Sequence, residues 1–321
     1  MRGLVIKSTG SSYIVRLDDG SDAECHIKGN FRIRGIRSTN PVAVGDYVQV
    51  SLIEEGSTTP QRSDFTGEVG LIGWITDVEE RRNYIVRRST NLSKESHIIA
   101  SNLDQVALIV TINHPVTSTT FIDRFLATAE AYRVPAVLIF NKIDLLTPQE
   151  LLRLDELRTL YESLGYQTVA ISAKNLSAKD GLSTILTGKT TLLSGNSGVG
   201  KSTLLNAMFG KEIARTGHIS DAHNKGMHTT TFSEMFPYHG GWIIDTPGIK
   251  GFGAIDMKKE EVGHYFREIF QIGQQCRFGN CTHTNEPGCA VQQAVIEDKI
   301  AISRLESYLS LLGDCTESKY R

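Results

Sequence analysis

The sequence predicts an α/β protein, with a small β-barrel before the α/β domain and a helical region after it. Short strand patterns separated by turns fill residues 1–98. Strand and helix patterns alternate over residues 99–254, and helical patterns flank a cysteine-bearing loop in residues 255–321. We expect three domains with these boundaries, because a chain of 321 residues is long enough for several separate cores.

Composition and charge exclude several classes of protein. The formal net charge of −2 creates no overall field that attracts nucleic acid, so any such contact must come from local patches. The N-terminus lacks the apolar segment of a signal peptide, and no apolar run approaches the length of a membrane span. We expect a cytoplasmic monomer without membrane association. In such a protein five cysteines favour metal binding over a disulfide framework.

The N-terminal region reads as a small closed barrel. Alternating or continuous apolar patterns cover residues 3–7, 12–17, 23–27, 47–52 and 72–77, and Asp-Gly, Lys-Gly and Val-Gly-Asp turns separate them. Five short strands in fewer than 100 residues favour an OB-fold.

Two basic clusters belong to the loops of this barrel. The first is Lys28, Arg32, Arg34 and Arg37 around Phe31, and the second is Arg81, Arg82, Arg87 and Arg88 around Tyr84. Cations interleaved with an aromatic ring suit single-stranded nucleic acid, because charge meets phosphate and the ring stacks on a base. The alternative is a solvated loop, since acidic residues elsewhere leave the region close to neutral.

The middle of the chain predicts a parallel sheet with helices on both faces. Strand patterns cover residues 106–112, 136–140 and 168–172, and an amphipathic helix pattern covers residues 119–132. Thr147-Pro148-Gln149-Glu150 forms a capping box that begins a second helix, which runs to Leu164. Ligands of such sheets bind at the carboxyl ends of the strands, so the residues after each strand carry the functional information.

A phosphate-binding loop follows the strand pattern at residues 189–193. Its residues are Ser194, Gly195, Asn196, Ser197, Gly198, Val199, Gly200, Lys201 and Ser202, which fit G-x-x-x-x-G-K-[ST]. A helix pattern follows and ends at Gly210. The flanking strand and helix argue against a chance match. The backbone N–H groups are expected to surround a phosphate, with Lys201 reaching the terminal phosphates and the Ser202 hydroxyl binding Mg²⁺.

Two further motifs predict that the nucleotide carries guanine. They are N-K-x-D, formed by Asn141, Lys142, Ile143 and Asp144, and S-A-K, formed by Ser172, Ala173 and Lys174. The Asp144 carboxylate can accept two hydrogen bonds from guanine, a pair of donors that adenine lacks. Asn141 is placed to contact the base and the phosphate loop, the Lys142 stem can cover the ring, and the Ala173 N–H can meet the guanine carbonyl. An ATPase is therefore disfavoured.

A magnesium switch is expected after the strand pattern at residues 242–244. In Asp245-Thr246-Pro247-Gly248 the aspartate can hold a water of Mg²⁺, and the Gly248 N–H can contact the γ-phosphate. A threonine of the preceding polar loop can bind Mg²⁺ only when the γ-phosphate is present. Thr230 is the first choice and Thr229 the second.

These motifs occur in an unusual order. Ordinary GTPases place N-K-x-D and S-A-K after the phosphate loop, whereas here both precede it, so we interpret the domain as a circularly permuted P-loop GTPase. The chain resembles the ribosome small-subunit-dependent GTPase A family (RsgA, also called YjeQ) over nearly its full length.

This resemblance implies a Mg²⁺-dependent GTP hydrolase in late assembly of the small ribosomal subunit, whose partners are GTP, GDP, the subunit and its rRNA. The alternative is a GTP-switched protein-interaction module that does not act on the ribosome. Salt dependence separates the two, because RNA binding weakens steeply as salt rises.

A metal site is expected in the C-terminal region. Cys276, Cys281, His283 and Cys289 offer three thiolates and an imidazole at close spacing, which suits one closed tetrahedral Zn²⁺ site of structural type. The alternative is a set of unrelated buried cysteines. Cys25 and Cys315 lie outside this spacing and are interpreted as free thiols.

The hydrolytic machinery departs from the Ras pattern. Ile249 stands where Ras-like proteins place a glutamine that orients water, and an apolar side chain cannot replace it. His228, beside the switch threonines, is the nearest candidate catalytic substitute. The alternative, which the sequence favours equally, is a loop histidine that contacts backbone or RNA. Residues 249–253 then lead directly into the helical region, so we expect a hinge there.

Overall fold

The computed structural model describes residues 1–8, 12–27, 41–53, 71–88, 96–177, 180–210, 233–245 and 257–317. Its contacts divide the chain into two compact units. The first comprises Met1–Gln105, Thr184–Leu193 and His218–Ile249, and the second comprises Val106–Ser183, Ser194–Gly217 and Lys250–Arg321. The predicted domain boundaries at residues 98 and 254 stay a prediction.

Five strands of the first unit close into a barrel, as the sequence predicts. They are β1 (Arg2–Ser8), β2 (Tyr13–Leu17), β3 (Asp22–Ile27), β4 (Tyr47–Leu52) and β5 (Leu71–Val78). The order is β1-β2-β3-β5-β4, and β4 returns to pair with β1. Strands β3 and β5 are parallel, and the other pairs are antiparallel. Alternate residues such as Val5, Val15, Val48 and Ile75 fill the interior, which is the period-two pattern expected of strands with one buried face.

Six further elements lie wholly or partly in the first unit. They are β6 (Tyr84–Arg88), β7 (Ser96–Ser101), β11 (Thr190–Gly195), β12 (Glu234–Tyr238), β13 (Gly241–Asp245) and α3 (Leu182–Leu186). Strand β11 is parallel to β13, whereas β12 is antiparallel to β13 and pairs with β1 through Lys7 and Glu234. The sequence did not predict β6, β7, β12 or α3.

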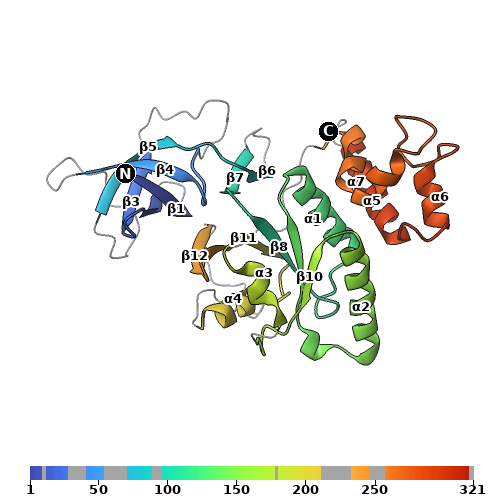
Figure 1. The fold of residues 1–321 in the computed structure, drawn as a ribbon, viewed down its shortest axis with the longest axis horizontal. Helices are drawn as coiled ribbons and strands as arrows, with labels where there is room; N and C mark the ends of the chain where they lie inside the picture. Colours follow the sequence, from blue (N-terminus) through green and yellow to red (C-terminus); the bar gives the residue numbers. More distant parts are fainter. Residues whose placement is uncertain are drawn as a thin grey trace, which may run out of the picture. The chain divides into compact units, whose positions relative to one another are not determined.

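The second unit holds a parallel sheet of order β10-β9-β8. Its elements are β8 (Gln105–Val110), α1 (Thr119–Ala131), β9 (Ala136–Phe140), η1 (Ile143–Leu145), α2 (Pro148–Ser163), β10 (Gln167–Ala170) and α4 (Lys201–Phe209). Helices α1 and α2 run beside each other along these strands (Figure 1). The expected capping box begins α2, since Thr147 and Glu150 exchange hydrogen bonds between side chain and backbone.

The C-terminal helices share a core with helix α1. They are η3 (Lys259–Tyr265), α5 (Arg267–Gly273), α6 (Ala290–Ile296) and α7 (Ile302–Glu317). Ala127 of α1 packs into the cluster formed by Val262, Phe266, Ile269 and Val291. Helix α7 also packs along α1. The helical region therefore joins the nucleotide-binding sheet through α1.

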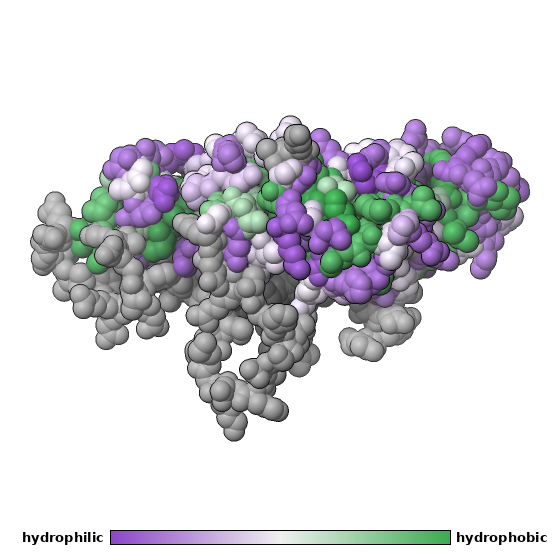
Figure 2. All heavy atoms as spheres, turned by 90° about the horizontal axis from the view of Figure 1, so that it is seen from below, coloured by the Kyte–Doolittle hydropathy of each residue, from purple (hydrophilic) through white to green (hydrophobic). Residues whose placement is uncertain are grey.

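Among the described residues, no helix is both long enough and apolar enough to cross a membrane. The face drawn in Figure 2 carries hydrophilic residues interspersed with hydrophobic ones.

Candidate functional site

The phosphate loop has the local geometry that its glycines predict. It leaves β11 at Ser194 and Gly195 and enters α4 at Lys201 and Ser202. Gly198 and Gly200 adopt left-handed φ values of 83° and 95°, which side chains other than glycine rarely adopt. A turn of this kind directs successive N–H groups toward one side, beside the positive end of the α4 dipole.

Asn141 joins the three motifs. Its Nδ2 donates to the Val199 carbonyl of the phosphate loop at 2.8 Å, and its Oδ1 accepts from the Ala173 N–H at 2.9 Å. The side chain is only 2% exposed, so both ends of this buried amide are paired. A Cβ at position 200 would lie 2.4 Å from Nδ2, and only glycine permits this approach. Three separate segments thus meet at one side chain.

The other base-motif residues surround this junction. Lys142 has a left-handed φ of 66°, and its Nζ donates to the His114 carbonyl at 2.5 Å. The Ile143 N–H donates to the Ile171 carbonyl, whereas Asp144 and Lys174 are exposed. Ser172 is 7% exposed, and its Oγ has no hydrogen-bond partner among the described residues.

The Ala173 N–H has a partner within the protein. The Ala173 N–H, expected to meet the guanine carbonyl, donates to Asn141 Oδ1 here. This hydrogen bond joins the N-K-x-D and S-A-K loops. Its donor is the backbone N–H that the sequence analysis assigned to guanine. Contact between Ala173 and guanine stays a prediction.

The magnesium motifs are described in part. Lys201 and Ser202 are half-buried at the start of α4, and Asp245 ends β13 opposite Leu193, the residue before the phosphate loop. This register places Asp245, the first residue of D-T-P-G, beside the strand that delivers the loop. His228, Thr229, Thr230, Gly248 and Ile249 lie outside the described residues.

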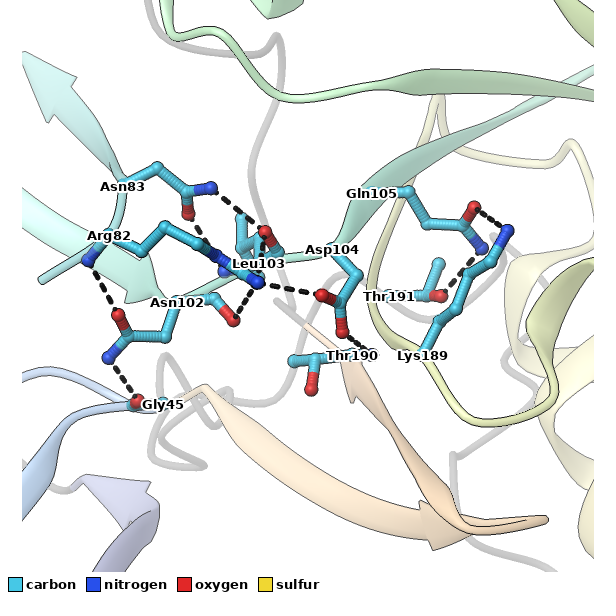
Figure 3. Close-up of polar contacts among 10 residues, drawn as sticks. All are labelled: Gly45, Arg82, Asn83, Asn102, Leu103, Asp104, Gln105, Lys189, Thr190 and Thr191. Atoms are coloured by element: carbon cyan, nitrogen blue, oxygen red, sulfur yellow. Dashed lines mark hydrogen bonds and ion pairs between the residues drawn. The ribbon is translucent and has the colours of Figure 1, made fainter.

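A polar network fixes the start of β11, the strand that leads into the phosphate loop (Figure 3). Asp104 accepts from the Thr190 N–H at 2.8 Å, and its other oxygen accepts from Arg82 at 2.8 Å. Gln105 donates to the Thr191 hydroxyl at 2.9 Å. Asn102 extends the network to the Gly45 carbonyl beside the barrel. The network gives β11 a fixed starting register.

Two arginines of the second basic cluster make ion pairs within the fold. Arg81 makes an ion pair with Asp46, and the two side chains are 6% and 0% exposed. Arg82 pairs with Asp104. The side chains of Arg87 and Arg88 lie outside the described residues, as does the whole first cluster. Arg81 and Arg82 thus pair with Asp46 and Asp104 within the fold. The sequence pattern did not distinguish this role from RNA binding.

The four predicted metal ligands form one cluster in the second unit. The ligand atoms of Cys276, Cys281, His283 and Cys289 all lie within 4.8 Å of one another. His283 Nδ1 is 3.5 Å from Cys276 Sγ and 3.4 Å from Cys289 Sγ, and these two sulfurs are 3.9 Å apart. Donor atoms of a tetrahedral zinc site are separated by roughly 3.5–3.8 Å, given its bond lengths. The cluster could therefore hold one metal ion.

The surrounding loop is arranged to present these donors. Glu286 accepts hydrogen bonds from the backbone N–H groups of Thr282 and Thr284 and from the Thr282 hydroxyl, which lowers the pKa of its carboxyl to about 2. Gly273 lets the His283 ring approach, because a Cβ there would lie 3.1 Å from Cε1. Burial raises the pKa of the Cys281 thiol to about 12, which a bound cation would reverse.

The sequence did not predict the residues that hold the loops of the metal cluster and of the nucleotide site in place. Glu286 ends a T-x-T-x-E pattern, and its carboxylate can cap several N–H groups. This local pattern was a signal that could have found it. Asn113 and His114 follow β8 and contact the first turn of α2 and Lys142, respectively. Nothing in the sequence distinguishes them from ordinary loop residues.

Comparison with protein families agrees with this geometry. The model of the RsgA GTPase family matches residues 78–255, and that of the RsgA N-terminal domain matches residues 2–59.

Named relatives are similar to the chain over its whole length. A protein of Phocaeicola vulgatus named small ribosomal subunit biogenesis GTPase RsgA is 58% identical, with 100% of this chain and 99% of that protein covered. A protein of the same name from Porphyromonas gingivalis is 53% identical with the same coverage.

Two solved structures share the fold. YjeQ from Thermotoga maritima has a TM-score of 0.73 at 32% identity, with 98% of each chain covered. YloQ, described as a circularly permuted GTPase, has a TM-score of 0.72 at 27% identity, with 100% of this chain and 96% of that chain covered.

Proposed function

The chain belongs to the RsgA GTPase family, and from this membership we propose that it is a Mg²⁺-dependent GTP hydrolase acting in late assembly of the small ribosomal subunit. The observation that carries the nucleotide assignment is the position of Asn141, which ties the phosphate loop to both guanine motifs. Three motifs that match by chance would have no reason to meet at one buried side chain.

The proposed nucleotide contacts follow from this arrangement. They comprise Asn141, Lys142, Ile143, Asp144, Ser172, Ala173, Lys174, the loop residues Ser194 to Ser202, Asp245 and Gly248. Loop N–H groups and Lys201 would bind the phosphates, and the exposed Asp144 is free to accept from guanine. Ser202 and Thr230 would bind Mg²⁺, which supplies charge stabilisation at the phosphates when it is present.

The attacking water needs an orienting group. Ile249 cannot provide one, so His228 is proposed for this role, in keeping with its position beside the switch threonines in the sequence. In this proposal its ring nitrogen accepts a hydrogen bond from the water and aligns it with the γ-phosphate.

Replacement of Asp144 tests the base assignment. In the Asp144→Asn variant one of the two donors of guanine faces an NH₂ group instead of an acceptor, so we expect GTP to bind at least about tenfold more weakly and xanthosine triphosphate to bind more tightly. Competition binding with GTP, XTP and ATP measures both changes. Asp155→Asn, an exposed change on α2, is the matched control. An unaltered preference for GTP would remove Asp144 from the base site.

The ribosomal role rests on the relatives, which are named as small ribosomal subunit biogenesis GTPases. We propose that the flanking domains bind rRNA and that the protein works as a cytoplasmic monomer. Since Arg81 is buried in an ion pair with Asp46, RNA contacts of the barrel would come from other residues, with the first basic cluster as the candidate. A GTP-switched module that grips a protein is the competing function, and its binding would depend weakly on salt.

The metal in the Cys₃His cluster is proposed to be Zn²⁺, because three thiolates and one imidazole match its preferred ligands. Three thiolates and one imidazole would fill all four positions of a tetrahedral ion and leave none for a substrate, so we propose a structural role. The ion would hold the loop between α5 and α6.

Metal analysis provides the test. We expect about one zinc per chain in freshly purified protein, and Cys281→Ser should lose most of it while nucleotide binding is largely retained. Cys315→Ser, outside the cluster, should keep its zinc. A chain that contains no metal, or equal loss in both variants, would contradict the site.

A further inference from the structure

Two loops at the edge of the parallel sheet are joined by one hydrogen bond. Strands β8 and β9 run in register, with Val110 opposite Phe140, so the loops that follow them leave the same edge. The Lys142 Nζ donates to the His114 carbonyl across these loops at 2.5 Å. Both residues adopt left-handed φ values, 66° for Lys142 and 58° for His114. Such values are unfavourable for side chains other than glycine and persist only where surrounding contacts impose them.

On the His114 side, Thr111 donates to the Pro115 carbonyl, and Asn113 supplies the contact to His114 itself. The Nδ2 of Asn113 donates to Glu150 Oε1 at 2.6 Å, while its Oδ1 accepts from the His114 N–H at 2.9 Å. Glu150 uses its other oxygen, Oε2, for the Thr147 N–H and hydroxyl in the capping box of α2. Asn113 therefore ties the His114 backbone to the first turn of a rigid helix.

The loop also rests on the phosphate loop. A Cβ at position 198 would lie 3.4 Å from Pro115, and one at position 200 would lie 3.8 Å from the Lys142 Cε. The Lys142 stem thus runs beside Gly200, and its head is held at His114.

We propose that Asn113 is a positioning residue for the guanine nucleotide, acting through the His114 carbonyl on Lys142. This inference rests on the proposed function, in which the Lys142 stem covers the base. A lysine has four rotatable bonds, so a fixed acceptor for its ammonium group selects the one direction that lays the stem over the ring. Without Asn113 the acceptor moves, and the nucleotide itself must order the side chain.

The test measures nucleotide affinity and turnover in the full-length protein. Asn113→Ala should raise the Kd for GDP and the KM for GTP by the same factor, about fivefold to tenfold, with kcat retained, because the base contact is common to ground and transition states. Val116→Ala, in the same loop and 69% exposed, is the matched control and should match wild type.

A double-mutant cycle separates positioning from a general effect on folding. Lys142→Ala removes the group that Asn113 positions, so the variant with both changes should bind GDP no more weakly than Lys142→Ala alone. Glu150→Gln should reproduce part of the loss, since its single amide oxygen cannot serve both Thr147 and Asn113. Unchanged affinity in Asn113→Ala, or additive losses with Lys142→Ala, would overturn the inference. If wild-type protein binds no GDP, the proposed function itself fails.

Discussion

A Lys201→Ala variant is expected to hydrolyse GTP about 100-fold to 1,000-fold more slowly than wild type. Lys201 begins helix α4 directly after the left-handed Gly200, where the loop N–H groups and the helix dipole already favour anions. Its ammonium group would supply the full positive charge at the terminal phosphates, and a loss of this size follows removal of one preorganised charge or donor from a transition state. Phosphate release at saturating GTP measures it.

Lys258→Ala provides the control for this prediction. Lys258 precedes η3, and its side chain is 77% exposed. The Lys258→Ala protein should therefore hydrolyse GTP at the wild-type rate. Normal turnover in Lys201→Ala would mean that the phosphate loop does not bind the nucleotide.

Arg304→Met is expected to destabilise the second unit by about 3–5 kcal/mol. Arg304 of α7 is 1% exposed, and it donates to Asp123 of α1 at 2.7 Å and to both oxygens of Glu268 of α5 at 2.6 and 3.1 Å. Methionine keeps much of the stem but leaves two buried carboxylates without a cation. Burial already raises the pKa of Asp123, so its charged form depends on this partner.

Urea unfolding of the metal-loaded protein measures this effect, with Arg153→Met as the matched control. Arg153 pairs with Glu156 at 2.9 Å, but its side chain is 53% exposed, and such surface pairs contribute less than about 1 kcal/mol. Equal stability of the two variants would show that the buried cluster is not an ion-paired network.

The Arg304 cluster also bears on the expected hinge. The sequence suggests that residues 249–253 let the C-terminal region move as the nucleotide changes, and these residues lie outside the described ranges. In the structure, Arg304 of α7 makes buried ion pairs with Asp123 of α1 and with Glu268 of α5. Arg267 of α5 adds a partly exposed pair with Glu130 of α1. Any such motion must therefore carry α1 with it or break the Arg304 contacts, which is costly.

Features set by neighbouring residues could be predicted from the sequence. The capping box of α2 needs only Thr147 and Glu150, and the phosphate loop needs only its own glycines and flanking elements. The metal cluster is equally local, because 14 positions, Cys276 through Cys289, contain all four ligands.

Contacts between distant residues could be predicted where a motif carries them, as for Asn141 and the phosphate loop, but not elsewhere. Arg304 and Asp123 are 181 positions apart, and Arg81 and Asp46 are 35 apart, so in the sequence each arginine reads as an ordinary surface charge. Strand β12 was missed because Pro237 lies within it, and proline lacks the N–H that a strand donates. The engagement of the Ala173 N–H by Asn141 likewise appears only once two loops have met.

The most direct test of the central claim is GTP turnover measured with and without purified small ribosomal subunits. If the nucleotide site is coupled to the subunit, the protein alone should hydrolyse GTP slowly, and subunits should accelerate release of phosphate at saturating GTP. Lys201→Ala should abolish the accelerated rate, which excludes a contaminating GTPase on the subunits. The same rate with and without subunits would contradict the claim that this GTPase acts on the small ribosomal subunit.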